Sequence, residues 1–154
     1  MGKATDSSPK QLDKLARSES RLMADTLRLS PDGPHNDDYT CQVAAASSEA
    51  VRVLNHATLF HAGVTHPSTV NDVLGAISRA TAGLDQLLRQ LGEALRRMQA
   101  STQLGDDRGN PVERVDRALS ELKAARAAAR TLAARLERAF NATAGLHLTD
   151  GRED

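Results

Sequence analysis

The chain has 154 residues, the usual size of one domain with a single hydrophobic core. Twenty basic and twenty acidic side chains cancel, so the chain lacks the summed positive field that sequence-independent binding to nucleic acid or to an anionic membrane usually needs. Aromatic residues make up only 2% of a chain that is 40% apolar, so we expect a core of leucine, alanine and valine, and therefore helices rather than strands.

Cysteine content and the N-terminal sequence bear on the compartment. Cys41 is the only cysteine, which excludes an intrachain disulfide and favours a reducing compartment. The first residues contain no apolar segment of the signal-peptide kind, and no apolar run reaches membrane-spanning length. We therefore expect a cytoplasmic protein that does not associate with a membrane.

The N-terminal part is expected to hold two short helices. Residues 1–8 are predicted to be disordered, and apolar residues at helical spacing predict a first helix over 9–29. The segment 30–34 contains two prolines and a glycine, which stop that helix. A second helix is expected over 38–62, with the polar residues at 36–38 as alternative caps.

The third helix is predicted from Pro67 or Ser68 to about Gln103 and has a regular apolar seam. Its seam residues, which alternate steps of three and four, are Val70, Val73, Ile77, Ala80, Leu84, Leu87, Leu91, Ala94 and Met98, widened by Leu74, Leu88 and Leu95. A face of this kind requires a partner helix. Glycines 75, 83 and 92 each cost about 1 kcal/mol relative to alanine, and are either tolerated or mark a close approach of another backbone or a slight bend.

The fourth helix is expected over 111–144, after a polar, glycine-containing break at 104–110. Asn110 and Pro111 are a helix-start pair with Glu113 in the capping-box position. The expected seam comprises Val115, Ala118, Leu122, Ala125, Ala129, Leu132, Leu136 and Ala139, flanked by Leu119, Ala133 and Phe140. Both long helices measure about 50 Å, and the short connection makes them antiparallel neighbours.

The predicted fold class is therefore all-α. We expect a four-helix bundle in which two short N-terminal helices pack on part of a long antiparallel C-terminal helical hairpin. The bundle forms one domain over 9–145, followed by a flexible tail at 146–154. The rest of the hairpin either projects or pairs with another copy, as in a coiled-coil homo-oligomer.

The segment Ala62–Leu74 resembles the turn of bacterial helix-turn-helix repressors of the lactose-repressor type, with Ala-Gly-Val-Thr followed by Thr-Val and Val-Leu pairs. His66 and Pro67 lengthen the turn by one residue, and the candidate recognition face carries no Arg or Lys. The resemblance implies a degenerate helix-turn-helix at 50–80. The alternative is an ordinary turn between two helices.

The residues that could bind a metal ion or take part in catalysis do not form a recognisable site. His56, His61 and His66 are spaced by five, which turns successive rings about 140° apart on a helix, so they do not converge on one metal ion. The pairs Asp37-Asp38 and Asp106-Asp107 lie in turns, where acids serve as caps. We expect no catalysis, cofactor, metal site or small-molecule substrate.

Two surfaces of the fourth helix are candidates for partner binding. Its outer face carries small residues where an exposed helix usually carries long charged ones, namely Ser120, Ala124, Ala127, Ala128, Thr131 and Ala134. These either allow a second helix to approach or supply helix propensity on a solvated surface. Its basic flanks include Arg126 and Arg130, which are candidate nucleic-acid contacts or ordinary solvated flanks of a coiled coil.

Two stretches, Glu49–Thr58 and His66–Gly75, resemble uncharacterised small helical proteins of actinobacteria that are often associated with mobile elements. The resemblance covers roughly 45–145 and implies a bacterial, cytoplasmic origin without implying an activity.

The sequence thus predicts a non-catalytic helical-bundle interaction protein that acts by protein–protein contacts or self-association, with another protein or itself as the partner. The alternative hypothesis is a DNA-associated accessory or regulatory protein, based on Ala62–Leu74 and the arginines of the fourth helix.

Overall fold

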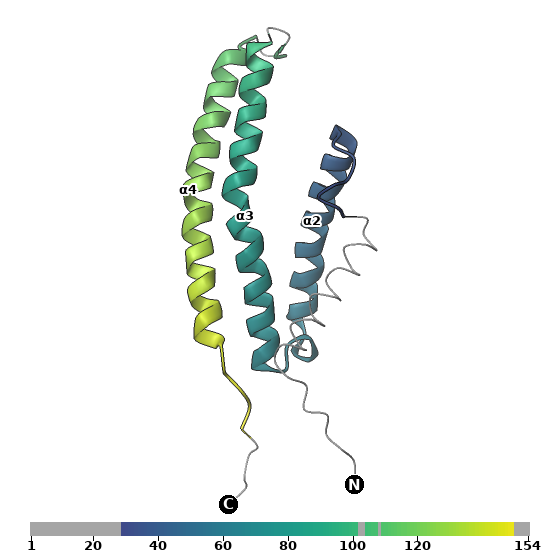
Figure 1. Ribbon diagram of the computed structural model, residues 1–154, viewed down its shortest axis with the longest axis vertical. Coiled ribbons are helices and arrows are strands. Elements are labelled where there is room, and N and C mark those ends of the chain that lie inside the picture. The colour runs from purple at the N-terminus through teal and green to yellow at the C-terminus, as the bar shows by residue number, and fades with distance from the viewer. Residues whose placement is uncertain (1–28, 102–103, 108, 150–154) are drawn as a thin grey trace, which may run out of the picture. The chain divides into compact units, whose positions relative to one another are not determined.

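The computed structural model describes residues 29–101, 104–107 and 109–149. In this part the chain forms three α-helices, α2 (Asp37–Leu59), α3 (Pro67–Ala100) and α4 (Pro111–Thr143), and a short 3-10 helix, η1 (His61–Gly63) (Figure 1). These residues contain no strand, which confirms the all-α fold class. The predicted helix over 9–29 falls outside the described residues except for Leu29, which is not helical, so the four-helix bundle stays a prediction.

The chain divides into two compact units, one ending at Leu59 and one beginning at Phe60, and each is described by itself. None of the three α-helices is long and apolar enough to cross a membrane.

In the first unit, α2 begins where Asn36 caps it. The Asn36 side-chain oxygen accepts a hydrogen bond from the Tyr39 backbone N–H at 2.9 Å, which selects Asn36 from the three predicted caps. The Tyr39 hydroxyl donates to the Ser30 carbonyl at 2.9 Å and accepts from the Ser30 N–H at 2.8 Å, so it holds the preceding turn. The helix ends at Leu59, three residues before the predicted end, because the chain turns into η1 there.

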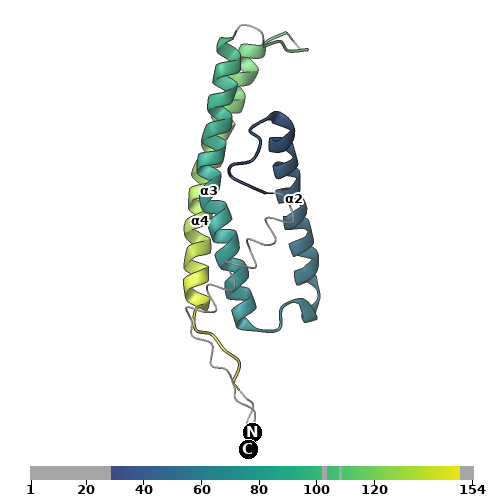
Figure 2. The ribbon, with the colours of Figure 1, turned by 45° about the vertical axis from the view of Figure 1, so that its right-hand side comes forward.

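In the second unit, α3 and α4 pack against each other as an antiparallel hairpin, and both views show them side by side (Figures 1 and 2). The predicted start of α4 is confirmed, since Asn110 accepts from the Glu113 N–H at 3.1 Å and donates to the Glu113 carboxylate at 2.8 Å. Asp106, in the connection, pairs with Arg114 at 2.7 Å. The left-handed backbone of Gly145, with φ of 80°, follows α4 directly, as predicted.

The rotation of α3 about its axis differs from the predicted one. The α3 residues that meet α4 include Asn71, Gly75, Asp85 and Gly92, which lie one or two positions along from the predicted seam. One position on an α-helix corresponds to a rotation of about 100°. As a result, Leu84, Leu87 and Leu91 of the predicted seam are exposed. The leucines predicted to widen that seam, Leu74, Leu88 and Leu95, are half-buried.

Two of the three α3 glycines lie against side chains of α4. A Cβ at Gly75 would lie 2.9 Å from Phe140 Cε2, and a Cβ at Gly92 would lie 3.4 Å from Leu119 Cδ2. A Cβ at Gly83 would meet nothing within 4 Å. Close approach of Phe140 therefore accounts for Gly75. Gly92 lies in the contact with α4 but has room for a Cβ, and Gly83 is a tolerated cost in helix propensity.

The three glycines predict three different outcomes for substitution by alanine. Gly83→Ala should stabilise the protein by about 1 kcal/mol, the helix-propensity gain. Gly92→Ala should gain less, because its new Cβ sits in ordinary contact. Gly75→Ala should destabilise by about 1 kcal/mol, since the clash with Phe140 outweighs the propensity gain. Urea unfolding followed by circular dichroism measures all three; equal effects at Gly75 and Gly83 would contradict the close approach of Phe140.

Candidate functional site

The hairpin has two long sides, and one of them carries a charge cluster. Asp85 of α3 pairs with two arginines of α4, Arg126 at 2.8 Å from Nε and Arg130 at 2.7 Å from Nη1. Arg126 stands four residues before Arg130, so both guanidinium groups project from one side of α4 toward the same carboxylate. The hydrogen bond from Arg126, with the charge of Arg130 beside it, lowers the pKa of the Asp85 carboxyl below its ordinary range.

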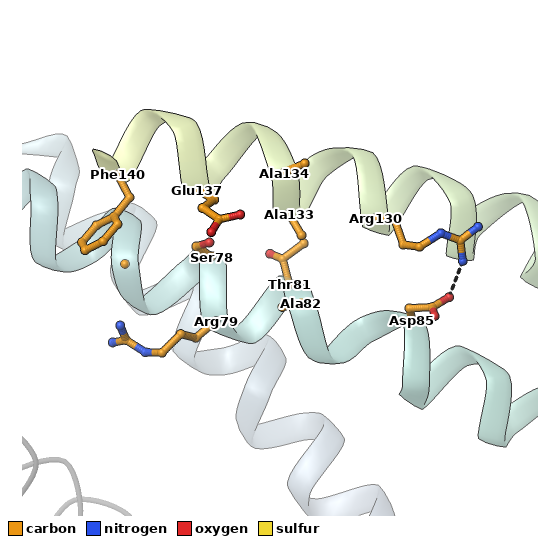
Figure 3. A pocket seen from close by; sticks show the side chains of 11 residues that line it. Ser78, Arg79, Thr81, Ala82, Asp85, Arg130, Ala133, Ala134, Glu137 and Phe140 are labelled. Atoms are coloured by element: carbon orange, nitrogen blue, oxygen red, sulfur yellow. Dashed lines mark hydrogen bonds and ion pairs between the residues drawn. The ribbon is translucent and has the colours of Figure 1, made fainter. Parts of the chain in front are cut away.

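A groove of about 530 Å³ extends from this cluster along the hairpin (Figure 3). Its floor is made of small residues, including Ser78, Thr81 and Ala133, and Phe140 lies over Gly75 at its far end. Arg130 and Asp85 form the near end, where Figure 3 shows their ion pair. The Asp85 carboxylate at that end is paired with two guanidinium groups, and the other carboxylate that lines the groove belongs to Glu137.

The other side of the hairpin is apolar. We define the apolar face as Leu84, Leu87, Leu91 and Met98 of α3 together with Ala118, Ala125 and Leu132 of α4. The four α3 side chains remain 37%, 48%, 45% and 52% exposed, in that order, and Leu132 is 50% exposed. At the end of the hairpin nearest the interhelical connection, Leu91 and Met98 line a groove of about 560 Å³ whose opposite wall contains Ala118 and Ala125. The apolar face therefore spans both helices.

The small residues predicted as a partner surface lie on α4 and are all exposed. Among these residues, Ala134 borders the polar groove, and the Thr131 hydroxyl donates to the Ala127 carbonyl within the helix at 3.2 Å. The structure thus places this surface in solvent in the second unit, and its role as a contact stays a prediction.

The structure brings together Arg126 and Arg130, the candidate nucleic-acid contacts. Both pair with the Asp85 carboxylate. The Arg126 side chain is 30% exposed and the Arg130 side chain 58% exposed. Both side chains therefore have a role within the hairpin, because they tie α4 to α3. Sequence reasoning missed Asp85, although its position among the uncharged seam residues was a signal that a cation would face it.

The remaining candidate residues do not gather. His56 lies in α2, His61 in η1 and His66 directly before α3. Cys41 is exposed on α2. Asp37 and Asp38 occupy the first turn of α2. Within residues 29–101, 104–107 and 109–149, no group of three or more His, Cys, Asp or Glu side chains is arranged to hold a metal ion.

Comparisons of the chain with protein-family models, with curated proteins and with solved structures gave no match.

The Asp85 cluster predicts a pH-dependent contribution to stability. A carboxyl group with a lowered pKa in the folded state stabilises that state above the unfolded value, about 3.9, and loses this contribution as the pH falls through the folded value. Asp85→Asn should therefore unfold at lower urea concentration than the wild type at pH 7, and the difference should shrink as the pH falls below about 3.9.

Glu93→Gln is the matched control, because Glu93 lies on the same helix and pairs only with Arg89 of its own helix, at 2.8 Å. At pH 7, Glu93→Gln should lower the urea concentration of unfolding by less than Asp85→Asn does. A difference between wild type and Asp85→Asn that persists undiminished at about pH 2.5 would show that the aspartate acts by packing rather than by charge.

Proposed function

We propose that this chain is a non-catalytic helical protein that acts by binding another polypeptide through the apolar face of the hairpin. The observation that carries the proposal is the row of half-exposed large side chains at Leu84, Leu87, Leu91 and Met98. Single exposed leucines are common on soluble proteins, but a row with helical seam spacing that continues onto a second helix is typical of a helix-binding surface.

Burial energetics support the same proposal. Full burial of a leucine or methionine side chain contributes roughly 1.5 to 3 kcal/mol, and about half of that remains unrealised at each of these four positions. Binding of a polypeptide that covers the row would be stabilised by that free energy, and it requires no catalytic or polar residues. The groove beside Leu91 and Met98 gives such a partner a concave place to insert side chains.

The cellular setting belongs to the same proposal. A cytoplasmic location rests on Cys41 as the only cysteine, which favours a reducing compartment. A bacterial, actinobacterial origin rests on the resemblance of Glu49–Thr58 and His66–Gly75.

Cysteine alkylation tests whether another molecule covers the apolar face. In a Cys41→Ser background, Leu91→Cys places a thiol on the face and Gln86→Cys places one at an exposed position of the same helix. We expect Leu91→Cys to be alkylated more slowly than Gln86→Cys, either at high protein concentration or after addition of cell extract. Dilution of the purified protein should remove any protection that a second molecule provides.

Two outcomes would contradict the proposal. Equal alkylation of both thiols under every condition would mean that nothing binds the face. Slow alkylation of Leu91→Cys that does not change on dilution or with extract would mean that the chain covers its own apolar face.

The DNA-associated alternative receives less support, because Arg126 and Arg130 pair with Asp85. We expect no gel shift of duplex DNA at low salt, where electrostatic binding is strongest. A salt-sensitive shift that Arg126→Glu with Arg130→Glu abolishes, and that Asp85→Asn does not, would establish the alternative instead.

A further inference from the structure

The apolar seam of α3 matches a second copy of itself that runs in the opposite direction, because large residues of one copy then face small residues of the other. From Val73 to Met98 its residues read Val73, Ile77, Ala80, Leu84, Leu87, Leu91, Ala94 and Met98. When a second α3 is laid antiparallel so that Val73 stands opposite Met98, each small residue meets a large one. Ala80 then faces a leucine, Ala94 faces an isoleucine, and the two central leucines face each other.

We propose that the partner of the apolar face is a second copy of this chain, whose α3 runs antiparallel with its Leu87 opposite Leu84 of the first copy. This inference rests on the proposed function, because it names the polypeptide that the apolar face binds. In this register the eight seam positions from Val73 to Met98 are covered in both copies, and Val70 has no apolar partner. The register shifted by one heptad covers Val70 instead and leaves out Met98, which is the larger and the more exposed of the two, at 52% against 38%.

The shape of the apolar face fits this occupant. At the connection end of the hairpin, Ala94 forms part of the groove that Leu91, Met98 and Ala125 also line. Val73 and Ile77 of the second copy would enter that groove, because they stand opposite Met98 and Ala94. Ala94 is the small seam residue among those that line the groove, and the residue that would face it, Ile77, is large.

The charge around the seam also suits a second copy, since a charged surface would repel itself. The positions beside the seam on the side away from α4 are Ala76, Gly83, Gln90 and Arg97, of which three are uncharged. A Cβ at Gly83 would meet nothing within 4 Å, so the surface there is open to a neighbouring helix. The only charge of this set, Arg97, would lie near the small Ala76 of the second copy.

Disulfide formation between two single-cysteine variants tests the register. In the Cys41→Ser background, Ala80→Cys and Leu91→Cys are unfolded together, refolded and mildly oxidised. We expect a disulfide-linked heterodimer, because these two positions face each other across the pair. Neither variant should link to itself, since the two copies of each position would be about 16 Å apart along the helix axis.

The matched control mixes Ala80→Cys with Met98→Cys, a pairing offset by one heptad, or about 10 Å. We expect at least tenfold less heterodimer from this mixture. A larger yield from it than from Ala80→Cys with Leu91→Cys would overturn the proposed register, and absence of cross-linking in both mixtures would exclude both of these registers and overturn the proposal.

Light scattering on the full chain gives an independent measurement. The wild type should have the mass of a dimer, Leu87→Lys should be monomeric, and Gln86→Lys, which changes the neighbouring exposed residue, should remain a dimer. Circular dichroism checks that both variants keep their helices. A monomeric wild type whose Leu91→Cys thiol is protected only by extract would overturn the second-copy inference but uphold the proposed function.

Discussion

Close approach of Phe140 in α4 to Gly75 in α3 constrains the rotation of α3, and the other features of the hairpin depend on that rotation. Phe140 occupies the space above Gly75, and Leu119 lies against Gly92. These two contacts lie near opposite ends of α3, so together they leave little freedom to turn it. Because α3 is held this way, Asp85 faces the arginines of α4 and the leucine row faces away from them.

The polar contacts across the hairpin fix where one helix stands along the other. Asn71 donates to the Phe140 carbonyl and to the Thr143 hydroxyl, both at 2.8 Å, near the end where α4 finishes. Asp85 pairs with Arg126 and Arg130 near the middle. Sliding of one helix along the other would separate these polar groups from their partners and leave them unpaired, which costs free energy. The polar residues of α3 therefore specify how α3 and α4 are aligned. The exposed leucines of the apolar face remain available for another partner.

The sequence predicted the helices well because their signals are local. Proline at 67 and 111, the Asn110 cap and the glycine at 145 each act through neighbouring backbone groups. The α3 face that meets α4 was predicted only in part, because periodicity ranks faces by hydrophobicity and centred the seam on Leu84, Leu87 and Leu91, which are exposed. Glycine scores as neutral in such a ranking, yet Gly75 and Gly92 mark the true contact. The ion pair of Asp85 could not be predicted from spacing alone, since it joins residues 41 and 45 positions apart.

The two apolar candidates for partner binding differ in the free energy they can provide. Each leucine of α3 has three more carbon atoms than an alanine of the outer α4 face, and each buried CH₂ contributes about 0.8 kcal/mol. The alanine face, with residues such as Ala124 and Ala128, can bring a second helix close but adds little apolar area when it does. Ala118 and Ala125 play that role beside the leucines, where they widen the groove that Leu91 and Met98 line. Small residues of α4 thus shape the partner site, and large residues of α3 supply its affinity.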